Sequence, residues 1–103
     1  MMFRRLYWVV EEVEKSGNSQ VSGVYTSIFD LIKHGLGCVD EGNEIRLTLT
    51  KLDSNKPPLG VWTSPRFEGL ETELEEYVRT DEFTAEQCKS LSDELHRMYQ
   101  VPV

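Results

Sequence analysis

The sequence predicts an α+β fold in which a mainly antiparallel sheet of about four strands is covered by two to three helices. The pentapeptide Gly-Val-Tyr-Thr-Ser at residues 23–27 returns as Gly-Val-Trp-Thr-Ser at residues 60–64. Each copy follows a strand-like run and a polar turn, and each precedes an amphipathic stretch. We interpret the chain as two strand–turn–strand–helix units, residues 4–36 and 44–79, with an extra helix at residues 84–99.

The size and composition of the chain indicate one globular domain. Its 103 residues suit a single domain spanning residues 1–103, and the 39% hydrophobic and 28% charged contents are typical of globular proteins. No apolar run approaches the roughly 20 residues needed to span a bilayer, so no membrane partner is expected. Two cysteines, Cys38 and Cys88, are too few for a disulfide framework, which favours a reducing cytoplasm.

The negative charge of the chain is concentrated in its last third. The net charge is −7; residues 1–67 carry eight acidic and eight basic side chains, whereas residues 68–103 carry ten acidic and three basic ones. The sequence has no basic stripe, so nucleic acid is an unlikely partner. The acidic third is either a solvated helical surface or a docking face for another protein. Glu71, Glu75 and Glu76 are the candidate partner-binding residues of that face.

The first predicted strand covers residues 4–13, because Tyr, Trp and Val favour strands. Its apolar side chains alternate between the two faces. They are Leu6, Trp8 and Val10 on one face and Tyr7 and Val9 on the other. A strand that is apolar on both faces suits a sheet that is covered on both sides. This pattern predicts a homodimer.

A turn, a second strand and a short helix complete the first unit. Ser-Gly-Asn-Ser at residues 16–19 is a turn signal, and residues 20–25 return as the second strand. Ser27 can cap the helix, and Asp30 at its third position suits the positive end of the helix dipole. Gly35 is expected to end this helix.

The second unit contains the clearest strand pattern. In residues 45–50, Ile, Leu and Leu alternate with Arg, Thr and Thr, which indicates one buried and one wet face. Two prolines upstream restrict residues 59–62 to a short or edge strand. Ser64 followed by Pro65 predicts a helix start, with a capping hydroxyl before a proline at the first helical position.

The last predicted helix begins with a capping box at residues 84–87, and Phe83 can pack onto Cys88 beside it. It covers the remaining sheet face or meets a second subunit. The expected core is drawn from the apolar stripes of all these elements. It consists of Leu6, Trp8, Val10, Val24, Leu31, Ile45, Leu47, Leu49, Phe67, Leu70, Leu74, Leu91 and Leu95.

Each pentapeptide ends in a Thr-Ser pair at an expected helix start, next to an aromatic residue. Free amide groups at a helix start can bind an anion, so the two starts form a candidate ligand site. The alternative is that the hydroxyl groups cap their own helices. The candidate ligand-binding residues are Tyr25, Thr26, Ser27, Trp62, Thr63 and Ser64.

The sequence contains no motif typical of catalysis, metal binding or cofactor binding. His34 and His96 lie on different expected helices, and the sequence contains no CxxC or HExxH motif. A nucleophile pair of Cys38 or Cys88 with His96 is a weak alternative. We therefore expect a small cytoplasmic, non-enzymatic interaction or regulatory protein with no catalytic residues, metal or cofactor. It would bind a protein partner through its acidic helices or through its exposed aromatic strand. The alternative is a module that binds a small ligand or anion.

Overall fold

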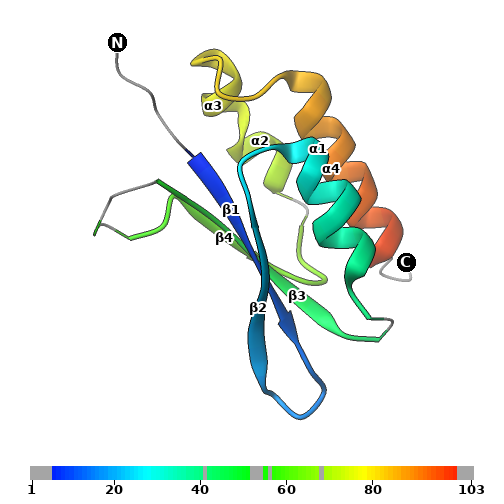
Figure 1. Cartoon of the computed structure of the whole chain (residues 1–103). Helices are drawn as coiled ribbons and strands as arrows, with labels where there is room; N and C mark the ends of the chain where they lie inside the picture. The colour runs from blue at the N-terminus through cyan, green and yellow to red at the C-terminus, as the bar shows by residue number, and fades with distance from the viewer. Residues whose placement is uncertain (1–5, 41, 52–54, 56, 68, 100–103) are drawn as a thin grey trace.

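The computed structural model describes residues 6–40, 42–51, 55, 57–67 and 69–99. The first two residues of the expected first strand and first unit, Arg4 and Arg5, lie outside this part of the chain. The described residues form a four-stranded antiparallel sheet with helices packed on one face, which confirms the α+β class (Figure 1).

The sheet contains the two expected hairpins, β1–β2 and β3–β4. They are β1 (Leu6–Val13), β2 (Ser19–Tyr25), β3 (Glu44–Lys51) and β4 (Gly60–Thr63). The spatial order is β2-β1-β3-β4, so β1 and β3 are central and β2 and β4 form the two edges (Figure 1). Each hairpin is followed by helical structure. The interpretation of these segments as two repeat units stays a prediction.

The helical segments are short except for the last one. They are α1 (Ile28–Asp30), η1 (Leu31–Gly35), η2 (Leu36–Cys38), α2 (Leu70–Glu73), α3 (Glu75–Arg79) and α4 (Ala85–Met98). The segments α1, η1 and η2 follow one another without a break, and η1 is a π-helical turn. The Ser27 hydroxyl accepts a hydrogen bond from the Asp30 N–H (3.3 Å), which confirms the expected cap. The expected stop at Gly35 is wrong, since helical structure continues to Cys38.

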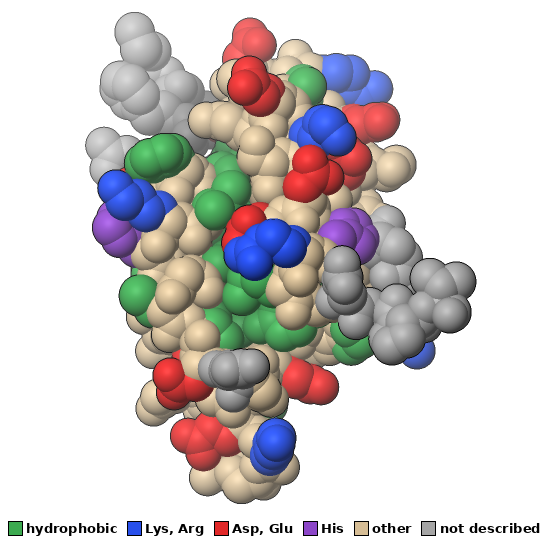
Figure 2. All heavy atoms as spheres, turned by 90° about the vertical axis from the view of Figure 1, so that its right-hand side faces the viewer, with side chains coloured by type: hydrophobic (Ala, Val, Ile, Leu, Met, Phe, Trp, Pro, Cys, Tyr) green, Lys and Arg blue, Asp and Glu red, His purple; other side chains and the backbone are tan. Residues whose placement is uncertain are grey.

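The core lies between the helices and one face of the sheet. Alternate residues of β1 and β3 are buried on this face, and Trp8 and Leu47 are fully buried. Leu31, Leu70 and Leu91 meet them from the helical side. Figure 2 views the molecule from this side and shows hydrophobic side chains in the middle of the face, bordered by acidic and basic ones. The alternating pattern of β3 was therefore interpreted correctly.

The opposite face of the sheet, hereafter the open face, is not covered by any of the described helices (Figure 1). Tyr7 and Val9 of β1 are only half-buried there. Val24 of β2 is 56% exposed, so its assignment to the core is wrong. The register pairs Val24 with Val9, and this places both side chains on the open face.

The two pentapeptides play the same structural role on the two edge strands. A Cβ atom added at Gly23 would lie 2.4 Å from the Tyr25 hydroxyl oxygen, and one added at Gly60 would lie 2.4 Å from the Trp62 ring. Each aromatic ring therefore lies over the bare backbone of the glycine two residues earlier. The ring thereby replaces the side-chain packing that a strand lacks at a glycine. The valine between them, Val24 or Val61, faces the open side and is exposed.

The expected helix start at Ser64 and Pro65 is wrong. The ladder between β3 and β4 extends through Ser64, whose N–H donates to the Ile45 carbonyl (2.9 Å). The Ser64 hydroxyl accepts a hydrogen bond from the Ile45 N–H (2.9 Å), so it is occupied by the sheet. Helical structure begins at Leu70, after a turn, and Leu74 separates α2 from α3.

Candidate functional site

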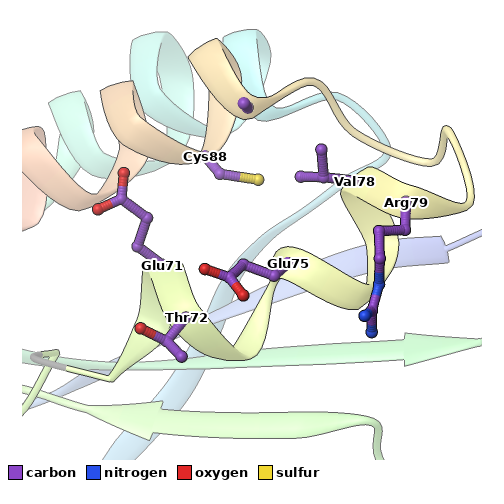
Figure 3. A pocket seen from close by; sticks show the side chains of 7 residues that line it. Glu71, Thr72, Glu75, Val78, Arg79 and Cys88 are labelled. Carbon is purple, nitrogen blue, oxygen red and sulfur yellow. The ribbon is translucent and has the colours of Figure 1, made fainter.

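A pocket of about 360 Å³ lies between the α2–α3 pair and the N-terminal half of α4 (Figure 3). We call it the helical pocket. Its volume falls in the lower part of the range of small-ligand and side-chain sites, roughly 300–1,000 Å³. The residues that line it are Glu71, Thr72, Glu75, Val78, Arg79, Ala85 and Cys88.

Helical spacing explains why these residues share one wall. Leu70 and Leu74 are fully buried and hold α2 and α3 against the core. Glu71 and Glu75 each follow one of these leucines, four positions apart, so they lie on neighbouring turns of the same face. The other wall is the first part of α4, which the expected capping box fixes. The Thr84 hydroxyl accepts from the Gln87 N–H (3.1 Å), and the Gln87 side chain accepts from the Thr84 N–H (3.0 Å).

The Cys88 thiol forms part of the apolar wall of the helical pocket. Its sulfur points across the pocket toward Val78 (Figure 3). Burial raises the pKa of the Cys88 thiol, and the nearby Glu71 carboxylate raises it further. The protonated thiol is therefore favoured at neutral pH, and it behaves as a small hydrophobic group rather than as a thiolate nucleophile.

The helical pocket combines an apolar wall with carboxylates at its opening. Val78, Ala85 and Cys88 supply the apolar surface, while the exposed Glu71 and Glu75 supply negative charge. The guanidinium group of Arg79 extends away from Cys88 (Figure 3). Such a site matches a group with an aliphatic stem and a cationic head, as in lysine or arginine.

The structure brings two of the three candidate partner-binding residues into this pocket. Glu71 and Glu75 line it, whereas Glu76 does not. Glu76 lies one position further round α3, where its carbonyl oxygen accepts a hydrogen bond from the Thr80 hydroxyl (3.3 Å). A neighbouring carboxylate, Glu73, accepts a hydrogen bond from the Trp62 indole N–H and so ties α2 to the sheet edge. The sequence did not indicate this contact.

The candidate ligand residues do not share a groove in the described structure. Tyr25 pairs with Trp8, and so Ser27 follows β2 toward the end of the sheet where β1 begins. Ser64 bonds to Ile45, which pairs with Glu12 near the end of β1. The two serines thus lie at diagonally opposite corners of the sheet.

Both serine hydroxyl groups are used within the fold, and their neighbours divide into buried and exposed residues. Ser27 caps α1, and Ser64 bonds to β3. Trp62 and Ser64 are buried, Tyr25 and Ser27 are half-buried, and Thr26 and Thr63 are exposed. The expectation of a ligand site at these residues gains no support from their arrangement.

The two cysteines lie on different helical segments, and Cys38 follows His34 by four positions along the chain. Cys38 is exposed at the end of η2, whereas Cys88 is buried, and both are free thiols. His96 Nδ1 lies 2.7 Å from the Ser92 carbonyl oxygen of its own helix, and His96 does not line the helical pocket. Within the described residues, no group of three or more His, Cys, Asp or Glu side chains could hold a metal ion.

A cluster of polar side chains, which the sequence did not indicate, lies at the end of β1. The buried carboxylate of Glu12 accepts hydrogen bonds from the Asp40 N–H (3.3 Å) and from the Asn43 side-chain amide. The Tyr99 hydroxyl donates to the Asn43 carbonyl (3.4 Å). Each polar group is used to hold the loop before β3 against the end of α4, so we assign this cluster a structural role.

Comparisons with known proteins do not place the chain in a family. No protein-family model matches it, and no significant match was found among curated proteins or among solved structures. Among the helices that the structure describes, none is both long enough and apolar enough to cross a membrane.

Proposed function

We propose that this chain is a small non-enzymatic interaction protein, and that its helical pocket receives a lysine or arginine side chain of a protein partner. The observation that carries the proposal is the placement of Glu71 and Glu75 beside the apolar wall formed by Val78, Ala85 and Cys88. A long basic side chain could lay its methylene groups along this wall while its charged head meets the carboxylates.

The charge distribution supports a basic partner. Ten of the 18 acidic residues belong to residues 68–103, which include the pocket-forming helices. A negative field around the pocket attracts a positively charged surface and increases the rate of encounter. Exposed ion pairs contribute little each, so we expect the pocket to select the partner's basic side chain rather than to supply most of the affinity.

The cellular location is part of the same proposal. Cys38 and Cys88 are both free thiols, which is compatible with a reducing compartment such as the cytoplasm. A second copy of the chain is a further expected partner. It would need a surface other than the helical pocket, because that pocket is rich in carboxylates and repels an acidic copy.

The test is a selection of short displayed peptides against the immobilised protein at low salt. We expect the selected peptides to contain lysine or arginine and to bind about tenfold more weakly to the Glu71→Gln/Glu75→Gln double variant. Glu76→Gln is the matched control, since it removes a carboxylate from α3, the helix of Glu75, outside the pocket. Peptides without basic residues, or equal losses with Glu76→Gln, would contradict the proposal.

A further inference from the structure

The open face carries most of the exposed large hydrophobic side chains of the described chain. Those exposed side chains are Val21, Val24, Phe29, Leu59 and Val61. Val21 and Val24 belong to edge strand β2, Leu59 and Val61 lie at edge strand β4, and Phe29 belongs to α1. Val24 and Val61 are 56% and 51% exposed. Apolar surface at both edges of one uncovered sheet face indicates an interaction site.

The strand register arranges this face symmetrically. Val24 pairs with Val9, Val9 pairs with Thr48, and Thr48 pairs with Val61, so one row crosses all four strands with a valine at each end. The midpoint of the row lies between β1 and β3. The repeated pentapeptide explains this symmetry, because it places the same Gly-Val-aromatic pattern on both edge strands.

A pair of opposite charges lies across the same midline. Glu11 of β1 pairs with Arg46 of β3 in the register, and the Arg46 guanidinium lies 3.2 Å from the Glu11 carboxylate. Both side chains remain partly exposed. A twofold rotation about this midline places the positive group of one copy opposite the negative group of the other. The charge pair is therefore complementary to a second copy of itself.

We propose that a second copy of this chain packs its open face against the first about a twofold axis running along the strands between β1 and β3. Such an axis lays β1 of one copy over β3 of the other. Val24 then faces the partner's Val61, and Glu11 faces the partner's Arg46, and both contacts occur twice. Two sheets pack face to face in this way with their strands within about 30° of each other.

The charges on the open face favour a second copy over a basic partner. Each copy has a net charge of −7, so two copies repel unless their acidic regions stay apart. The charged positions of β1 and β3 that alternate onto the open face are Glu11, Glu44 and Arg46, which nearly balance. The acidic helices lie on the other side of the sheet (Figure 1).

The size of the open face predicts a weak dimer. The strands contain 8, 7, 8 and 4 residues. At about 3.3 Å per residue and about 4.8 Å between strands, they present roughly 430 Å² per copy in projection. Two copies would therefore bury at most roughly 860 Å², somewhat below the roughly 1,000 Å² at which stable specific interfaces begin. We expect a dissociation constant in the micromolar range.

Sedimentation equilibrium tests whether the open face forms the dimer interface. We expect the wild-type chain to dimerise, and Val61→Asp to raise the dimer dissociation constant at least about thirtyfold, because each substitution acts twice in a symmetric dimer. Phe29→Asp is the matched control, since it replaces an exposed hydrophobic residue on the helical side. A monomeric wild-type chain, or equal losses in both variants, would overturn the proposal.

Cross-linking tests the position of the twofold axis, and its substitutions disturb the fold less than Val61→Asp does. In a Cys38→Ser background, Val24→Cys and Val61→Cys chains are prepared separately and treated with a short bismaleimide. The axis predicts cross-linked dimers in the mixture of the two variants and little in either variant alone. Equal cross-linking of each variant with itself would overturn the axis. The Glu71→Gln/Glu75→Gln variant should dimerise normally, which separates this proposal from the proposed function.

Discussion

At the residue scale, each edge strand packs an aromatic ring on a glycine. We expect Gly60→Ala to destabilise the protein by about 1–3 kcal/mol, because the new Cβ would lie 2.4 Å from the buried Trp62 ring and force it to move. The free energy of unfolding in urea measures this loss. Gly37→Ala is the control, since its Cβ would meet its nearest neighbour at 3.8 Å, and its stability should equal or exceed that of the wild type. Equal stability of both variants would show that the ring does not pack on the backbone.

A second prediction at this scale concerns the titration of Tyr99. Burial, with smaller contributions from the carboxylates of Glu12 and Glu44, raises the pKa of Tyr99 from 10.0 to about 12. Because the folded pKa exceeds the unfolded one, the contribution of neutral Tyr99 to stability is complete below pH 10 and is lost as the pH rises to about 12. We expect this loss to be about 1–2 kcal/mol, allowing for partial exposure.

Spectrophotometric titration of the tyrosines, together with unfolding measured between pH 8 and pH 12, checks the Tyr99 prediction. Tyr99→Phe should remove the high-pH titration and should flatten the dependence of stability on pH in that range. A Tyr99 that titrates near pH 10 would contradict the burial of its hydroxyl beside Asn43.

Residue patterns predicted most of the core, and the errors have a geometric cause. Twelve of the thirteen expected core residues are buried, and Val24 is exposed. Hydrophobicity alone does not say which face of β2 meets the core. That face is set by pairing with β1, which aligns Trp8 with Tyr25 rather than with Val24. Trp62 and Phe83 were missed, although both pack against the ring of Trp8.

At the element scale, two serines with the same local sequence have different roles. Ser27 caps a short helical segment at the surface, whereas the buried Ser64 satisfies the Ile45 N–H within the sheet. We expect Ser27→Ala to cost about 0.5–1 kcal/mol and Ser64→Ala about 1–3 kcal/mol, because the second change leaves a buried donor without its partner. Chemical denaturation of the two variants measures the difference. A larger loss for Ser27→Ala would contradict this assignment.

The candidate site shows which structural features local sequence predicts and which it does not. The sequence indicated the acidic helical residues and the capping box of α4, and the structure places Glu71, Glu75 and Cys88 around one pocket. It did not indicate that α2 starts as late as Leu70, because Ser64 and Pro65 form a good local start signal. A long-range bond to β3 overrides that signal, and local sequence contains no information about such a bond.

At the scale of the whole molecule, the chain separates an acidic helical side from a nearly neutral sheet face. The two proposed interactions should therefore respond differently to salt. Binding of a basic peptide in the helical pocket depends on exposed carboxylates, so it should weaken by about tenfold as salt rises from low concentration to about 0.5 M. Dimerisation through the open face depends on apolar contact between two chains of net charge −7, and salt screens their repulsion.

The dimer should consequently be unchanged or tighter at about 0.5 M salt, where the screening length falls well below 10 Å. Parallel salt series of peptide binding by fluorescence anisotropy and of self-association by sedimentation equilibrium measure the two responses. The Glu11→Arg/Arg46→Glu double variant adds a control, because exchanging the two charges keeps the open face self-complementary. It should dimerise like the wild type, whereas Arg46→Glu alone places like charges opposite each other and should weaken the dimer. Weakening of the wild-type dimer by salt would instead locate self-association on the charged helices.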